Sequence, residues 1–347
     1  MTALGAPARP EQDASPRLLP WRRMAWVTWR QHRIALAGVA ALLGALAVWL
    51  WLEGLAAHRA YAAAADCHPA SSGACGALAG YFLNYVSTGQ VIATVLQAVP
   101  ALIGAFVGAP VLAREMETGT FRYAWTLGFG RWRWTLAKLV PLGIVVAAAT
   151  GAFSALFSWY YQPFLTQTLS FNTQVPLDPG LFDLRGVAFA AWTLTAFAIG
   201  ALAGMLIRRV VPALAATLAV YTGLAVAAGL YLREHYMTPL LVKNASAPGS
   251  AWVISQQWYA KGSQPVSQSE LSQVLQQGAP QLAGKGGLPQ DDPTVSQYLA
   301  QHGYTLWTTY QPGSRFWPFQ WIEGGWLLAL SVLLIAATVW LVRRRAA

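Results

Sequence analysis

Residues 113–139 read AREMETGTFRYAWTLGFGRWRWTLAKL, and the rest of the chain is best interpreted outward from this stretch. Its charged side chains are Arg114, Glu115, Glu117, Arg122, Arg131, Arg133 and Lys138. No Asp, Glu, Lys or Arg occurs from 67 to 113 on one side or from 139 to 177 on the other. A short, mostly basic segment between two long apolar runs is typical of a cytoplasmic loop that joins two membrane helices.

Aromatic residues alternate with the arginines of this segment. They are Tyr123, Trp125, Phe129, Trp132 and Trp134. Such a mixture suits a helix at the membrane surface, with one face in the headgroups and the other toward a soluble partner. The alternative is an ordinary connecting loop with anchoring arginines.

The segment resembles the cytoplasmic loop after the second helix in type-2 ATP-binding-cassette (ABC) exporter permeases. Those proteins tend to carry an E-x-E-x-G-T run, then an Arg, then a Lys where the next helix begins. The matching residues here are Glu115, Glu117, Gly119, Thr120, Arg131 and Lys138. One departure is Gly128, at a position where many relatives have Pro. The later RFWPFQWIEGGW, the apolar run after it and Arg343–Arg345 also resemble actinobacterial members of this family.

The resemblance implies a permease subunit that works with two cytoplasmic ATPase subunits and a second permease copy or homologue. ATP and Mg would then be bound by the ATPase, and this chain would hold no cofactor. The residues expected to couple to the ATPase are Arg114, Glu115, Glu117, Gly119, Thr120, Arg122, Arg131 and Lys138.

The two glutamates are two positions apart, so on a helix they point to different sides. We expect one to hold the loop to its own scaffold, through Arg122 or an arginine of the N-terminal helix, and the other to face the ATPase. Gly119 permits positive φ and Thr120 can cap the helix that follows, so these two residues are expected to set the turn.

Composition places the chain in a membrane. Of its 347 residues, 56% are hydrophobic and 10% charged, whereas a soluble domain carries about 25% charged residues. Each of six apolar runs approaches or exceeds the ~20 residues that span a bilayer, which predicts an all-α integral membrane protein with six transmembrane helices. The runs cover 34–52, 91–113, 139–161, 186–207, 210–232 and 325–342. The pair Arg208–Arg209 between the fourth and fifth runs predicts a very tight turn.

The arginines predict that both termini are cytoplasmic in the cell membrane. With this orientation the inner segments 1–33, 114–138, 208–209 and 343–345 are all positive and together carry +12. The outer segments 53–90, 162–185 and 233–324 together carry −2. The net charge of +10 therefore anchors a topology and needs no nucleic acid to explain it.

Four regions follow from this topology. Residues 1–33 form a cytoplasmic tail with an amphipathic surface helix over 21–33. Residues 34–232 hold the first five helices, 233–324 an extracytoplasmic domain, and 325–347 the last helix and a basic tail. Within 233–324, Ser267 and Glu270 form an S-x-x-E capping box, Asp292–Pro293 begins a second helix, and 251–259 and 304–310 are rich in strand formers. These patterns predict a small α/β insertion, with a collapsed, partly disordered loop as the alternative.

Cys67 and Cys75 both lie in the first outer segment, so we predict a disulfide between them. His58 and His68 are close in sequence, which makes a metal site the alternative. No metal site is expected elsewhere.

Small residues recur at GxxxG spacing at Gly104/Gly108 and Gly200/Gly204, and every four residues along 215–227, which predicts helix packing. Four polar side chains in the spans either line a translocation path or hydrogen-bond to neighbouring helices. They are Gln97, Thr150, Ser154 and Ser158.

Missing motifs restrict the function. The predicted spans contain no Asp, Glu, Lys, Arg or His, and the chain has no catalytic signature or Walker loop. We therefore expect no enzyme activity in this chain. The favoured function is a permease subunit of an ABC transporter that exports a lipid-like or amphipathic small molecule or peptide. The alternative is a membrane-anchored sensor or assembly protein with a ligand-binding extracytoplasmic domain, and a membrane-embedded enzyme comes third.

Overall fold

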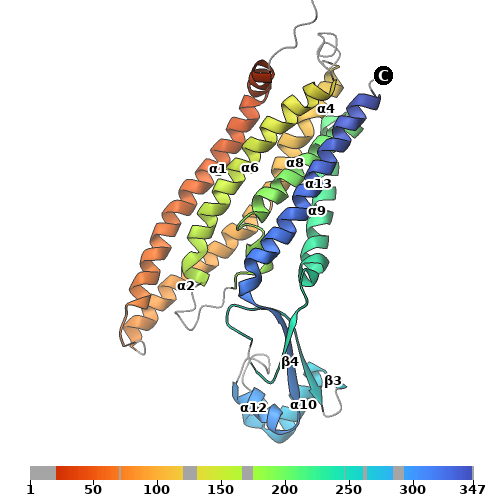
Figure 1. The fold of residues 1–347 in the computed structure, drawn as a ribbon. Coiled ribbons are helices and arrows are strands. Elements are labelled where there is room, and N and C mark those ends of the chain that lie inside the picture. Colours follow the sequence, from red (N-terminus) through yellow and green to blue (C-terminus); the bar gives the residue numbers. More distant parts are fainter. Residues whose placement is uncertain are drawn as a thin grey trace, which may run out of the picture.

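The computed structural model describes residues 21–69, 72–119, 131–165, 175–245, 247–260, 264–283 and 293–345. In this part of the chain, six helical stretches are long and apolar enough to cross a membrane, as predicted. They lie side by side, and a small α/β domain sits at one end of the bundle (Figure 1). We call this the domain end. The opposite end, where α4 stops and the carboxyl terminus lies, is the loop end.

The first two spans form a helical hairpin that is longer than its apolar runs. α1 (Trp21–Ala65) and α2 (Gly73–Leu96) meet at the domain end (Figure 1). The sequence limits 34–52 and 91–113 are therefore wrong as helix limits, because a helix need not stop where its apolar run stops. His58 illustrates this, since its ring stacks on Trp159 with the centroids 4.6 Å apart. Residues 21–33 are the first turns of α1 and not a separate helix.

The second span changes its helical geometry midway. It continues through α3 (Val99–Ile103), a π-helical turn η1 (Gly104–Gly108) and α4 (Ala109–Thr118). Pro100 and Pro110 lie in the first turns of α3 and α4, and each lacks the N–H that a regular helix would use. The second span is therefore made of successive helical segments, with new segments beginning at Val99 and Ala109.

Glycines bring this span against α8 (Ala188–Ile207). A Cβ on Gly200 would lie 2.2 Å from the carbonyl oxygen of Gly104, and a Cβ on Gly108 would lie 2.6 Å from that of Phe197. Only glycine permits such a close backbone approach. The two predicted GxxxG pairs therefore serve helix packing.

α8 is the centre of the bundle. In its most apolar window 67% of the residues are buried, compared with 17% in α1 and 17% in the span that begins with α9 (Val210–Ala227). α8 contacts α4, α6 (Arg131–Leu165), α9 and α13 (Phe316–Arg345). The outer helices expose their apolar side chains, as lipid-facing helices do.

The segment between α9 and α13 contains a four-stranded antiparallel sheet. A π turn (Ala228–Leu232) and a 3-10 turn (Arg233–His235) end the fifth span. The strands β1 (Leu240–Lys243), β2 (Trp252–Ala260), β3 (Gln264–Val266) and β4 (Thr305–Gln311) follow in the spatial order β1-β4-β2-β3. β2 and β4 match the two predicted strands and pair antiparallel to each other.

Three helices complete this α/β domain. They are α10 (Gln268–Gly278), α11 (Pro280–Ala283) and α12 (Pro293–Gln301). Leu271 of α10 and Leu299 of α12 pack against Trp258 and Leu306 of the sheet and form a core separate from that of the bundle. The predicted capping box of Ser267 and Glu270 starts α10.

Candidate functional site

The ends of the 114–138 segment lie at the loop end, on α4 and α6 (Figure 1). Residues 120–130, and with them Thr120 and Arg122, fall outside the described residues. The described part still contains six of the eight residues expected to couple to an ATPase. They are Arg114, Glu115, Glu117, Gly119, Arg131 and Lys138.

Glu115 and Lys138 form an ion pair that joins α4 to α6. The Lys138 side chain is 6% exposed and that of Glu115 17%. The Lys138 ammonium also lies 4.5 Å from the ring centroid of Trp134, one helical turn earlier on α6. Removing Glu115 would leave the ammonium of Lys138 buried without a counter-charge, so this contact links the two helices.

Glu117 ties the same segment to a third helix. Its Oε2 accepts a hydrogen bond of 3.1 Å from the backbone N–H of Val210, the first residue of α9. The first N–H groups of a helix have no partner within it, and the N-cap residue Arg209 provides no side-chain cap. Glu117 supplies that cap from outside while the rest of its side chain remains exposed.

Both carboxylates therefore hold the chain's own helices, whereas we expected one to contact an arginine and the other to face a partner. The reason is geometric. The α8–α9 turn at Arg208, with φ of 59°, brings the start of α9 beside the end of α4. The turn itself is as tight as the sequence predicted, since α8 ends at Ile207 and α9 begins at Val210.

Gly119 ends α4 in the left-handed conformation, with φ of 69°. No atom lies within 4 Å of a Cβ built at this position, so backbone conformation alone selects glycine here. Arg131 then starts α6, and the guanidinium of Arg343 at the end of α13 lies 5.6 Å from the ring centroid of Trp132. The loop end thus gathers α4, α6, α9 and α13 around the 114–138 segment.

The four side chains proposed for a polar path all hydrogen-bond to backbone carbonyl oxygens. Gln97 donates to Gly180 at 3.0 Å, and Ser154 donates to Gly186 at 2.9 Å. Thr150 donates within its own helix, to Val146 at 2.8 Å, and Ser158 donates to Ser154 at 2.8 Å. Only the bonds of Gln97 and Ser154 reach another segment, and these two favour the packing interpretation for their side chains.

Cys67 and Cys75 are joined by a disulfide, as predicted. It closes the short connection between α1 and α2 at the domain end (Figure 1). Within the described ranges, no group of three or more His, Cys, Asp or Glu side chains is placed to hold a metal ion.

A second polar cluster, which the sequence did not predict, lies at the domain end. The Arg233 side chain donates to Glu323 from Nε at 3.1 Å and from Nη2 at 2.8 Å, and Nη2 also pairs with Asp183. Arg233 is 1% exposed and Glu323 0%. This ion pair joins the end of the fifth span, the start of α13 and the segment before α8.

Glu323 accepts two further hydrogen bonds. Trp192 of α8 donates from Nε1 at 2.7 Å, and the Tyr236 hydroxyl donates at 3.1 Å. Beside it, Gln320 accepts from the Ala188 N–H at 2.9 Å. The carboxylate is thus fully satisfied, as a buried charge must be.

The expectation of spans without ionisable groups is therefore wrong. The helices extend beyond the apolar runs, so α13 begins at Phe316 and includes Glu323, and α6 includes Lys138. A signal was present in the sequence, because Asp183, Arg233 and Glu323 all flank apolar runs at the same predicted side of the membrane.

Comparison with known families now identifies the family. The model of the family described as "ABC-2 membrane transporter related" matches residues 40–233. The chain belongs to this family. The match covers the chain from residue 40 within α1 through α9, including Glu115, Glu117 and Lys138, and it ends before the α/β domain and α13. No curated protein and no solved structure matched the chain.

Family membership and the six spans together establish a multi-pass membrane protein of the ABC permease type. In such a transporter the permease is the membrane component, and family membership implies an ABC ATPase as its partner.

Proposed function

We propose that this chain is the permease subunit of an ABC exporter, driven by a separate cytoplasmic ATPase that binds ATP and Mg. The observation that carries the proposal is the pair of glutamates at the loop end. Glu115 binds α6 through Lys138, and Glu117 binds α9 through Val210. A force applied to the 114–138 segment would reach three helices at once.

That force has a continuous path into the bundle. α4 packs against α8 so closely that a Cβ on Gly204 would lie 2.4 Å from the carbonyl oxygen of Ala109. α8 in turn contacts α6, α9 and α13. Movement of α4 is thus passed to the central helix as a rigid body, which is how packed helices switch between two arrangements.

Two features support a cytoplasmic loop end. Arginines concentrate there, at Arg114, Arg131, Arg208, Arg209 and Arg343, and positive charge marks the inner side of a membrane. The disulfide lies at the opposite end, and disulfides persist on the oxidising side of a membrane. The α/β domain would then be extracytoplasmic.

A second permease copy or homologue is part of the proposal, because ABC permeases of this type work in pairs. The stripe Ala215, Ala219, Gly223 on α9 is exposed in the single chain, unlike the glycines that pack α8. It supports α9 as a lipid-facing or partner-facing helix. We infer one ATPase for each permease.

The proposed substrate is a lipid-like or amphipathic small molecule or peptide. The charged side chains of Lys138 and Glu115, and of Arg233 and Glu323, are paired with each other. The four polar side chains considered for a translocation path donate hydrogen bonds to backbone carbonyl oxygens. The interior therefore offers apolar surface and little free charge, which suits an amphiphile better than an ion or a sugar.

Co-purification tests the proposal. The chain is expressed with the ATPase encoded beside it, reconstituted in nanodiscs and assayed for ATP hydrolysis with candidate amphiphiles. We expect a stable complex whose hydrolysis rises with substrate and disappears when the Walker lysine of the ATPase is replaced. A chain that binds no ATPase, yet whose α/β domain binds a ligand, would favour the membrane-anchored sensor.

A further inference from the structure

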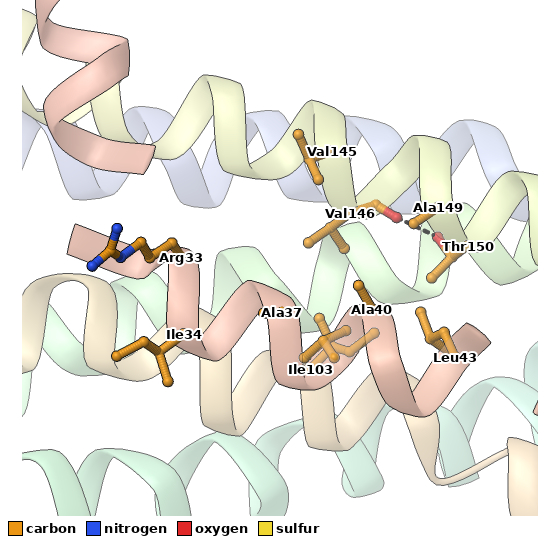
Figure 2. Close-up of a pocket in the computed structure, with 11 residues that line it drawn as sticks. Arg33, Ile34, Ala37, Ala40, Leu43, Ile103, Val145, Val146, Ala149 and Thr150 are labelled. Carbon is orange, nitrogen blue, oxygen red and sulfur yellow. Dashed lines mark hydrogen bonds between the residues drawn. The ribbon is translucent and has the colours of Figure 1, made fainter. Parts of the chain in front are cut away.

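A cavity of about 470 Å³ opens between α1 and α6 at the loop end of the bundle. Its walls are α1 from Arg33 to Leu43, Ile103 of α3, and α6 from Val145 to Thr150 (Figure 2). Small-molecule sites in proteins have volumes of roughly 300–1,000 Å³, apolar walls and a few well-placed polar groups. This cavity has those features.

The two polar side chains that line the cavity, Arg33 and Thr150, lie at its opposite ends (Figure 2). Arg33 and Leu43 mark opposite ends of the α1 wall (Figure 2). Thr150 uses its hydroxyl hydrogen on the carbonyl oxygen of Val146, 2.8 Å away. Arg33 is exposed and, within the described residues, makes no ion pair or hydrogen bond. Its guanidinium is the one cavity group with free donors.

The cavity also has the depth of one membrane leaflet. From Arg33 to Leu43 the wall rises about 15 Å at 1.5 Å per residue, which is half of a hydrocarbon core about 30 Å thick. The apolar run of α1 begins at Ile34, directly after Arg33, so Arg33 lies at headgroup depth.

The charge of the walls selects an anion. α6 contains no acidic residue, and α1 contains none before Glu53, toward its other end. We propose that this cavity binds a single-chain anionic amphiphile, with its aliphatic chain between α1 and α6 and its carboxylate or phosphate on Arg33. The volume, in the lower half of the usual range, suits one chain rather than two. Its role as an export substrate rests on the proposed function, whereas the binding itself does not.

Photolabelling tests the site with a palmitic acid that carries a diazirine on its chain. The full chain, purified in neutral detergent, is irradiated with this probe and the labelled peptides are mapped by mass spectrometry. We expect label on 33–43 and 145–150, displaced by unlabelled palmitate. Arg33→Gln should reduce it by about tenfold, as expected for loss of a charge-assisted hydrogen bond. Arg59→Gln is the matched control, because Arg59 is an exposed arginine near the other end of α1.

A second variant keeps the test decisive if Arg33→Gln folds poorly. Ala149→Phe fills the cavity and keeps the arginine, and it should abolish labelling while the unfolding temperature stays close to wild type. Equal labelling by the matching fatty alcohol, equal displacement by phosphatidylglycerol, or label spread along α9 would overturn the proposal. If both walls are labelled but the amphiphile does not stimulate the partner ATPase, the binding site is supported and its role in export is rejected.

Discussion

The two ends of the bundle are held by ion pairs that differ in burial. At the domain end Arg233 and Glu323 are 1% and 0% exposed in their side chains. At the loop end Lys138 is 6% exposed and Glu115 17%, and Glu117 is more open still. A fully enclosed pair fixes one arrangement of its helices, because separating it leaves a buried charge. A partly open pair can exchange its partner for water or another protein at lower cost. The domain end is therefore the fixed end of the bundle, and the loop end is the adjustable one.

The largest effect should come from breaking the enclosed pair. Glu323→Ala removes the acceptor of Trp192 and Tyr236 and leaves the buried Arg233 guanidinium with Asp183 as its remaining carboxylate partner, at a cost of about 3 kcal/mol. The unfolding temperature of the protein in detergent should fall accordingly. The double variant Arg233→Met with Glu323→Ala removes the enclosed guanidinium as well and leaves only the carboxylate of Asp183, whose side chain is 29% exposed, so it should be more stable than Glu323→Ala alone. A double variant no more stable than the single would contradict the assignment of this ion pair.

The sequence could not show this pair because its members are far apart in the chain. Arg233 is 90 residues from Glu323 and 50 from Asp183. Their contact depends on the rotation and depth of three helices, which apolar runs alone do not specify. The loop-end residues could be named as candidates from the sequence because Glu115, Glu117 and Gly119 lie in one short motif. Their actual partners, Lys138 and Val210, were not assigned from it.

The loop-end pair should respond asymmetrically to its two substitutions. Glu115→Gln strands the buried Lys138 ammonium and should destabilise the protein by about 2–3 kcal/mol. Lys138→Met leaves Glu115, which reaches water, and should cost less. Thermal unfolding of both variants measures the difference. A larger loss of stability in Lys138→Met than in Glu115→Gln would contradict the view that Glu115 can replace its partner by water.

A substitution that strains the backbone at the end of α4 should lower the stability of the protein only slightly but should abolish transport. Gly119→Val forces a β-branched residue into the left-handed region at a cost of about 1–2 kcal/mol, confined to the loop end. We expect nearly normal unfolding but lost transport. Gly119→Asn is the control, because asparagine tolerates this conformation best among non-glycine residues. Equal transport by the valine and asparagine variants would show that the backbone at 119 does not matter.

The smallest effect concerns the α/β domain. The backbone N–H and hydroxyl of Ser267 hydrogen-bond to Glu270 and lower the pKa of its carboxyl group. A lowered pKa in the folded state adds stability above the ordinary value of about 4.3, and this stability is lost as the pH falls through the folded pKa. The hydrogen-exchange protection factors of α10, corrected for the intrinsic pH dependence of amide exchange, should therefore fall below about pH 4. Glu270→Gln removes the titrating carboxyl group and should remove that pH dependence, and an unchanged profile would speak against the cap.

The α/β domain was largely predictable because its signals are local. Ser267 and Glu270 start α10, and strand-forming residues mark β2 and β4. The strand order was not predictable, since it places β4 between β1 and β2 through long-range pairing. The second span was predicted as one run, without the changes of helical geometry at Pro100 and Pro110, and the π turn between them packs against α8.

The central claim is that the 114–138 segment couples this permease to its ATPase, and Glu117→Lys tests it most directly. The substitution removes the cap on α9 and places a cation beside Arg208 and Arg209, while the spans remain unchanged. The matched control is Glu234→Lys at the domain end. The measurement is substrate-stimulated ATP hydrolysis and transport by the reconstituted complex. We predict that Glu117→Lys folds and binds the ATPase but loses both activities, whereas Glu234→Lys keeps them. Wild-type transport by Glu117→Lys would show that the segment is a plain connector and would contradict the account.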